Sequence, residues 1–179
     1  MATKPNFLHV GSFDVSSIKN AMYLFTSGAW DEFDYRQKTF EPHRKTKTIP
    51  LIFDSDFRLS NPTYMKNGKL FEKDLVKIAS ILNEHYGDGF IIRAILVKLV
   101  AGAEIPRHID RTDSLSVCKR CHIPVSTNPN VFFQVDEEVR NMEEGQIWEI
   151  NNAQKYHSVS NNSDQDRVHL IVDWMLNAA

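Results

Sequence analysis

The sequence has little cysteine, no long hydrophobic run and no excess of positive charge. Two cysteines in 179 residues are too few for the disulfide framework of a small secreted domain. No stretch approaches the roughly 20 apolar residues of a membrane-spanning helix, and residues 1–15 lack the basic flank and apolar run of an export signal. A net charge of -2 provides no basic field for nucleic acid phosphates. We therefore expect a soluble, cytoplasmic protein that binds neither a membrane nor nucleic acid.

Both cysteines, Cys118 and Cys121, lie in one CKRC segment. Such a pair can hold zinc or carry out redox chemistry, but a four-ligand zinc site needs a second CxxC or a short-spaced histidine pair. Neither accompanies this segment, and no thioredoxin-like pattern surrounds it. The alternation from 118 to 125 predicts a strand, in which side chains three residues apart point to opposite faces. We therefore favour two partly buried thiols over a zinc or redox site.

What the sequence does contain is material for one core. Hydrophobic residues make up 42% and aromatic residues 11% of the chain, and a chain of this length usually forms a single domain. Residues 14–27 predict an amphipathic helix with apolar side chains at helical spacing. Residues 71–86 predict a stronger helix, which the Gly-Asp-Gly segment at 87–89 ends. Between them, residues 49–53 predict a short strand.

From residue 90 onward the sequence changes to short runs typical of β-strands, separated by turn residues. These runs lie at 90–100, 118–127, 131–136, 145–150 and 167–175. A series of this kind predicts an antiparallel sandwich or barrel. We therefore expect one mainly β domain over residues 1–179, with a helical flank and a short strand at 1–89 and the β core at 90–176.

The first feature that points to chemistry is the segment His108-Ile109-Asp110. In an extended segment, residues two apart point to the same face, so an imidazole and a carboxylate can bind one ion. His157 can supply a third donor. Two histidines and one carboxylate on one face of a metal leave positions open for other ligands, as in non-haem iron(II) oxygenases. Because a histidine two residues from an aspartate is common by chance, this triad alone is weak support for a metal site.

An arginine at the start of the last β run strengthens the metal interpretation. A 2-oxo acid that binds iron through its keto and C1-carboxylate groups leaves a distal carboxylate, which suits a bidentate arginine. Arg167 is the candidate, and the period of 2 places it on one face of its strand with His169 and Asp173. By the same rule, Arg120 and His122 share a face of their strand. We expect His169 to be a buried histidine satisfied by a hydrogen bond rather than a fourth ligand.

The order and spacing of several segments are together more specific than any one of them. These segments are PRHID (106–110), RCHIPVSTNPNVFF (120–133), EEGQIWEINN (143–152), YHSVSNNS (156–163) and DRVHLIVDW (166–174). In this order they resemble the aspartyl/asparaginyl β-hydroxylase family of Fe(II)- and 2-oxoglutarate-dependent oxygenases. The resemblance covers roughly the C-terminal half and implies a double-stranded β-helix, also called a jelly-roll or cupin-like fold, at 90–176.

The resemblance also implies roles for single residues. His108 and His157 would ligate iron, Arg167 and His122 would bind 2-oxoglutarate, and Arg120 would lie on the substrate side. Asp110, which would complete the metal triad, is a departure from the animal members, which have glycine there. In this respect the chain is similar to bacterial members such as the free L-proline cis-hydroxylases. Val97 is a second departure, because the animal members have a serine there near the cosubstrate.

Together these features predict an enzyme that uses Fe(II), 2-oxoglutarate and O2 to hydroxylate an amino-acid side chain. The leading substrate is an aspartate or asparagine side chain in a peptide or protein, and a free amino acid of the proline type is the alternative. A cupin-type metal-binding module without oxygen chemistry, which binds a small anion or isomerises a sugar, is the alternative from another class, but a sugar isomerase has no need of Arg167. The basic run at 43–47 either clamps an acidic or peptide substrate or forms a solvated face.

Overall fold

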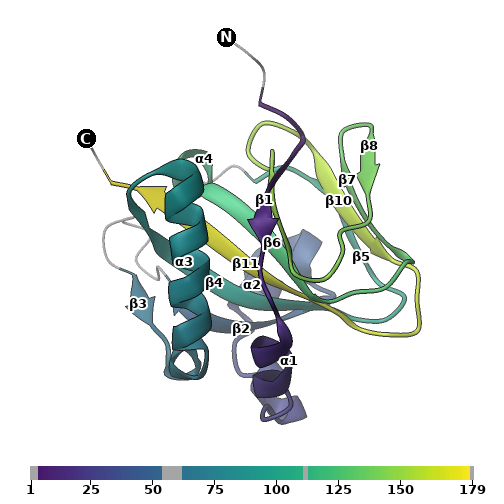
Figure 1. Cartoon of the computed structure of the whole chain (residues 1–179). Coiled ribbons are helices and arrows are strands. Elements are labelled where there is room, and N and C mark those ends of the chain that lie inside the picture. Colours follow the sequence, from purple (N-terminus) through teal and green to yellow (C-terminus); the bar gives the residue numbers. More distant parts are fainter. Residues whose placement is uncertain (1–3, 54–61, 111–112, 178–179) are drawn as a thin grey trace.

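The fold is a pair of antiparallel sheets, seen in a computed structural model that describes residues 4–53, 62–110 and 113–177. In these residues the larger sheet has the order β1 (Phe7–Ser12), β9 (Gln146–Ile150), β6 (Lys119–Ser126), β11 (Arg167–Leu176), β4 (Gly89–Leu99), β2 (Thr46–Phe53) and β3 (Thr63–Tyr64). The smaller sheet has the order β5 (Glu104–His108), β10 (His157–Asn161), β7 (Val131–Val135) and β8 (Glu138–Arg140). The expected mainly β architecture is therefore confirmed (Figure 1).

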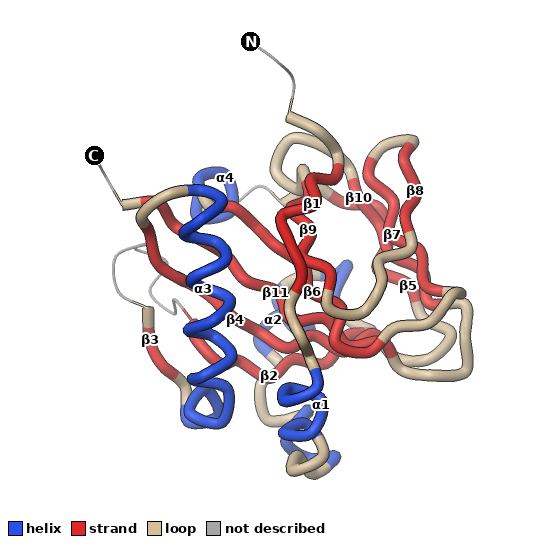
Figure 2. Tube along the Cα trace, in the orientation of Figure 1, coloured by secondary structure: helices blue, strands red, loops and turns tan. Residues whose placement is uncertain are grey.

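Helices are short except for one. They are α1 (Ser16–Met22), α2 (Tyr35–Thr39), α3 (Glu72–Tyr86) and α4 (Asp113–Val117), with 3-10 turns η1 (Ser27–Trp30), η2 (Glu41–His43) and η3 (Lys66–Phe71). Figure 2 shows α3 lying along the larger sheet, away from the smaller one. In the described part of the chain, no helix combines the length and apolar character needed to cross a bilayer.

The helix α3 forms where the sequence predicts it. Its apolar stripe includes Ile78 and Leu82, which are fully buried against the larger sheet. Burying side chains of this size stabilises the fold by about 1.5–3 kcal/mol each. The helix ends at Gly87, which adopts a φ of 92° that glycine reaches without a steric penalty. The Gly87 N–H donates to the carbonyl of Asn83 and so caps the last turn.

The helix predicted at 14–27 is shorter than expected, because it ends at Met22. Tyr23 and Leu24 are 87% and 71% exposed, so another helical turn would bury little apolar surface. Most of the stability of a helix in a protein comes from such burial rather than from propensity. The chain instead turns and enters η1.

The first half of the chain contributes more than a helical flank. The strands β1, β2 and β3 all belong to the larger sheet, so residue 89 does not mark a boundary in that sheet. The predicted strand at 49–53 extends back to Thr46, because Thr46 and Thr48 pair with Leu99 and Val97 of β4. The strand β2 is buried along nearly its whole length, which requires cover on both of its faces.

Two layers of apolar side chains position the site. One cluster lies between the larger sheet and the helices and includes Cys121, Ile123 and Val125. A second cluster includes Leu99 and Trp148 of the larger sheet and Phe133 and Val159 of the smaller one, so it fills the space between the sheets. The polar side chains of β6 and β11 that alternate with the first cluster therefore face the interior between the sheets.

We expect Gly145→Ala to destabilise the fold by about 1–3 kcal/mol, because two constraints meet at this turn. Gly145 has a φ of 78°, and an added Cβ would clash with the carbonyl oxygen of Phe13, whose own N–H donates to the Gly145 carbonyl at 2.8 Å. Urea unfolding measures the change. Gly28→Ala is the control, since the nearest atom, the Thr26 hydroxyl oxygen, would lie 3.8 Å from the added Cβ. Equal stabilities of the two variants would contradict this account.

Candidate functional site

The two candidate histidine ligands face each other across neighbouring strands. In the pairing of β10 with β5, His157 is the direct partner of His108. Directly opposed residues in an antiparallel pair hold their side chains within contact distance, and the two imidazole centroids lie 4.2 Å apart. The strand register therefore brings together residues that are far apart in the sequence.

Hydrogen bonds to the backbone select the tautomer of both rings. The Nδ1 of His108 lies 2.8 Å from the carbonyl oxygen of Pro106, and the Nδ1 of His157 lies 3.5 Å from that of Lys155. A carbonyl only accepts, so each Nδ1 carries the proton and each Nε2 keeps its lone pair. This backbone contact is the usual second partner of a metal-bound histidine. Burial also lowers the pKa of His157 to about 4, so its ring is neutral at neutral pH.

The carboxylate of Asp110 lies between the two lone pairs. Its oxygens are 3.8 Å from the His108 Nε2 and 4.0 Å from the His157 Nε2. Burial acts to raise the pKa of Asp110, but the charge of Arg120 and the amide of Asn152 help to hold that pKa below its usual range. Two imidazoles whose Nδ1 atoms face backbone carbonyls, together with one ionised carboxylate, fit the donor preferences of Fe(II).

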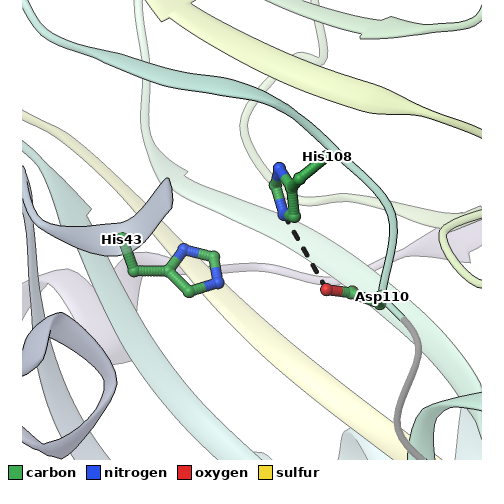
Figure 3. A group of neighbouring side chains, drawn as sticks. All are labelled: His43, His108 and Asp110. Carbon is green, nitrogen blue, oxygen red and sulfur yellow. Dashed lines mark ion pairs between the residues drawn. The ribbon is translucent and has the colours of Figure 1, made fainter. Parts of the chain in front are cut away.

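A third histidine, His43 of η2, approaches the same point. Donor atoms of His43, His108 and Asp110 lie within 4.8 Å of one another (Figure 3). However, the Nε2 of His43 is 3.2 Å from the Nη2 of Arg36, and a guanidinium only donates. The Nε2 must therefore accept, and the proton of the neutral ring is on Nδ1. While this bond persists, His43 has no lone pair for a metal, whereas His157 has one.

A buried ion triad crosses three strands of the larger sheet next to the metal triad. Asp173 of β11 is opposite Arg93 of β4 and Arg120 of β6. Its carboxylate accepts from the Arg93 Nη1 at 3.0 Å and from the Arg120 Nε and Nη2 at 2.8 and 2.9 Å. The remaining Nη1 of Arg120 donates to Asp110 at 2.9 Å. Arg120 thus links the ion triad to the metal triad.

Arg167 and two histidines form a second polar group deep between the sheets. Arg167 is 1% exposed, its Nε has no hydrogen-bond partner, and its Nη2 donates to the Nδ1 of His169 at 2.6 Å. Neither ring nitrogen of the buried His122 has a partner, and neither does the Nε2 of His169. In the described residues, no carboxylate forms an ion pair with Arg167.

A buried arginine without a counter-ion is costly. Burial lowers the pKa of Arg167 to about 9, so the group is still charged at neutral pH. The buried donors that lack partners call for an anion with several acceptor oxygens. The distal carboxylate of 2-oxoglutarate meets that need, and the group therefore fits the cosubstrate.

A cavity of about 330 Å³ opens beside the metal triad. Its walls combine apolar and cationic side chains: Phe40, Phe53, Ile95 and Leu115 with Arg36, Arg93 and Arg120. It also reaches His43, His108 and Asp110. The cavity has the composition of a small-molecule site, in which apolar walls surround a few convergent polar groups.

Several expectations about single side chains are confirmed. The side chains of β11 alternate between the two faces as predicted. Arg167 contacts His169 and Asp173 contacts Arg120 on the inner face. Val168 and Leu170 face the helices. His169 is buried and accepts a hydrogen bond through Nδ1, as expected, but its Nε2 has no partner.

The two cysteines of the CKRC segment contribute nothing to the site. Both cysteines are buried, and Cys121 packs in the apolar cluster under the helices. Burial raises the pKa of Cys121 to about 12, so its thiol stays protonated. Zinc binding and redox attack both require a thiolate. The interpretation as buried thiols is therefore favoured over both alternatives.

Among the polar pocket residues, Arg36 and Arg93 were not predicted from the sequence, and His43 was considered only as part of the basic run at 43–47. Arg36 lies in the five-residue helix α2, and His43 follows it in η2. Helices this short carry no periodic pattern that would orient a side chain. Arg93 lies within a predicted strand. Its place opposite Asp173 depends on which strands are neighbours in the sheet, and the sequence does not show that order.

Comparison with known proteins identifies the fold and a family. The model of the family described as aspartyl/asparaginyl beta-hydroxylase matches residues 27–176. No curated protein matches the chain by sequence. Among solved structures, an oxidoreductase of the 2OG-Fe(II) oxygenase family from Burkholderia pseudomallei superimposes with a TM-score of 0.59 at 13% identity, covering 73% of this chain and 67% of that one.

Two further structures share the fold over most of their length. A prolyl hydroxylase from Trichoplax adhaerens, in complex with a peptide fragment of the hypoxia inducible factor oxygen degradation domain, has a TM-score of 0.60 at 13% identity, covering 95% of this chain and 83% of that one. A Pseudomonas putida prolyl-4-hydroxylase has a TM-score of 0.52 at 13% identity, covering 98% and 91%. At these identities the likeness concerns the fold, and it confirms the predicted jelly roll.

We expect Asp173→Asn to destabilise the protein by about 3–5 kcal/mol at neutral pH, because it leaves two buried guanidinium groups without their carboxylate. Arg120 and Arg93 outweigh burial and hold the pKa of Asp173 below its usual range. A lowered pKa gives stability that is present above the unfolded-state pKa of about 4 and is lost as the pH falls through the folded-state pKa. The difference from wild type should therefore shrink below about pH 4.

Urea unfolding at pH 7 and at acidic pH measures this difference. The control is Asp34→Asn, which removes an ion pair with Lys38 whose side chains are 52% and 75% exposed. Exposed pairs contribute at most about 1 kcal/mol. A loss at Asp173 no larger than that at Asp34 would show that the triad does not hold the sheet.

Proposed function

This chain belongs to the aspartyl/asparaginyl β-hydroxylase family, so it is a 2-oxoglutarate-dependent hydroxylase, and we propose that it holds Fe(II) with His108, Asp110 and His157. The observation that carries this proposal is the convergence of two Nε2 lone pairs on one carboxylate, at 3.8 and 4.0 Å. The tautomers of both histidines support it, since each Nδ1 faces a backbone carbonyl. Three protein donors on one face leave open positions for the cosubstrate and O2.

We propose that 2-oxoglutarate binds with its distal carboxylate on Arg167 and with His122 beside it. Arg167 is buried without a carboxylate partner among the described residues, and both His122 nitrogens are unpartnered. The rings of His122 and Phe133 lie 5.1 Å apart, and those of Phe133 and His157 lie 6.2 Å apart. Phe133 thus separates the cosubstrate group from the metal group while contacting both.

The metal and cosubstrate supply the oxidising chemistry: O2 is activated as 2-oxoglutarate is oxidised to succinate and carbon dioxide, and a C–H bond of the substrate becomes C–OH. The protein orients the reactants and excludes water. Val97, Ile95 and Ile171 form an apolar patch on the inner face of the larger sheet, which excludes water from that side. Arg120 keeps the Asp110 carboxylate ionised and fixes its orientation.

The substrate we propose is an amino-acid side chain in a peptide or protein, of the aspartate or asparagine type that the family description names. The Trichoplax prolyl hydroxylase that shares this fold was solved with a peptide, which supports a peptide substrate for this architecture. Arg120, which lines the cavity beside Asp110, would lie on the substrate side. A free amino acid is the second candidate, favoured by the small cavity of about 330 Å³. Arg167 argues against a cupin-type sugar isomerase, because such an enzyme has no use for a buried cation.

The metal assignment predicts a spectroscopic change. Anaerobic addition of Fe(II) and 2-oxoglutarate should produce the weak visible charge-transfer band of the chelate. His108→Ala and His157→Ala should each lose the band and the formation of succinate, because two protein donors no longer hold the metal facially. His85→Ala is the matched control, since His85 is exposed on α3. A wild-type protein that gives no band at saturating ligand would refute the proposed function.

The cosubstrate assignment predicts a loss of affinity. Arg167→Gln should raise the 2-oxoglutarate concentration needed for half-maximal band intensity at least tenfold, since a charge-assisted hydrogen bond contributes about 1.5–3 kcal/mol. Arg167→Lys should lose less, because the charge remains without the planar fork. Lys66→Gln, which removes a charge that is 75% exposed, is the control.

A second measurement separates cosubstrate binding from structure. Without 2-oxoglutarate, Arg167→Gln should unfold at a urea concentration no lower than wild type, because it removes a buried cation that lacks a counter-ion. A large loss of stability would mean that Arg167 serves the fold instead.

A further inference from the structure

The cavity beside the metal triad holds more positive than negative charge. Arg36, Arg93 and Arg120 all line it and are all at most 8% exposed. In the described residues, the carboxylates that contact them are those of Asp110 and Asp173. Both carboxylates are already engaged, since Asp173 holds two guanidinium groups and Asp110 faces the metal position. Glu41 also lines the cavity, but its exposed carboxylate lies beside Arg44, so Arg36 has no ion pair among the described residues.

Two of the three arginines have buried N–H groups without an acceptor. All of the Arg120 nitrogens donate to Asp110 or Asp173. Arg93 uses only Nη1, and its Nε and Nη2 have no partner. Arg36 uses Nη2 on His43, and its Nη1 has no partner. Arg120 is thus satisfied, whereas Arg36 and Arg93 still have donors to offer.

The Nη1 group of Arg36 has no hydrogen-bond acceptor in the described part of the protein. Burial, followed by the charge of Arg120, lowers the pKa of Arg36 to about 10, so the group is still charged at neutral pH. A buried charged donor without a partner is costly, and native proteins place one where a ligand completes it. Because His43 accepts from Arg36 through Nε2, its own buried and unpartnered Nδ1 is a further donor. A ligand with acceptor oxygens would satisfy both groups.

We propose that Arg36, with Arg93, binds a carboxylate of the substrate, and that His43 positions Arg36 for this. The inference rests on the proposed function, and it assigns the contact with the substrate carboxylate to a residue of the N-terminal half. A guanidinium fork matches a carboxylate in geometry as well as charge. The apolar walls at Phe53 and Ile95 suit the carbon skeleton that follows. The substrate is therefore an acidic side chain or a free amino acid with its α-carboxylate.

The test is calorimetric titration of the whole chain, metal-free, with pairs of probes that differ by a carboxylate in place of an amide. One pair is blocked aspartate and blocked asparagine, and the other is L-proline and L-prolinamide, which both carry an ammonium group. The member with the carboxylate in at least one pair should bind about tenfold more tightly than its amide partner, as expected for charge-assisted hydrogen bonds. Preference within the first pair identifies an acidic side chain, and preference within the second a free amino acid.

Variants tie this preference to Arg36. Arg36→Gln should abolish the preference, Arg36→Lys should retain part of it, and Lys38→Gln on the same helix should leave it unchanged, since Lys38 is 75% exposed. Wild-type unfolding curves for each variant would show that the fold is intact. Arg167→Gln should also retain the preference, because it affects the cosubstrate group.

Three results would overturn the inference: no preference in either pair, a preference that survives Arg36→Gln, or a preference that is lost with Arg167→Gln alone. The visible band of the Fe(II) and 2-oxoglutarate chelate separates this inference from the proposed function. A normal band without any carboxylate preference refutes the inference only. An absent band with an intact, Arg36-dependent preference refutes the proposed function only.

Discussion

The buried carboxylate of Asp173 is the constraint on which the site depends. It lies in the middle of β11, is completely buried, and is flanked in the sheet by Arg93 and Arg120. An ionised carboxylate is stable there only with both guanidinium groups in place, so the register of β4, β11 and β6 is fixed by charge as well as by apolar packing. Arg120, oriented in this way, has one nitrogen left for Asp110. The central strands of the larger sheet thereby orient a residue at the end of β5 in the smaller one.

Buried polar groups in this protein fall into two kinds. Asp173 and Arg120 have partners inside the protein and serve the architecture, whereas Arg93 of the same ion triad, Arg167, His122 and Arg36 have buried atoms without partners. Since native interiors leave few such atoms unsatisfied, they mark the places where other molecules complete the structure. The two places differ in depth, because Arg167 is enclosed between the sheets while Arg36 borders an open cavity.

Much of the site follows from strand periodicity. The alternation of β11 predicts that Arg167, His169 and Asp173 face inward, and the segment from His108 to Asp110 predicts two donors on one face. Sequence could not predict that His157 pairs with His108, because β10 is short and its polar residues resemble a turn. Nor could it predict the partners of Arg120, which depend on the strand order β6, β11, β4.

The origin of the cavity walls has a consequence for how such an enzyme diversifies. The residues proposed for the metal and the cosubstrate come from strands β5, β6, β10 and β11 and from the segment just after β5, whereas Arg36 and His43 come from short helical turns that precede β2. Changes in those turns leave the register of the sheets untouched. Target recognition can therefore drift in evolution, or be redesigned by grafting residues 35–43, while the oxidising machinery is inherited intact. This separation makes the turns the natural place to engineer a new selectivity.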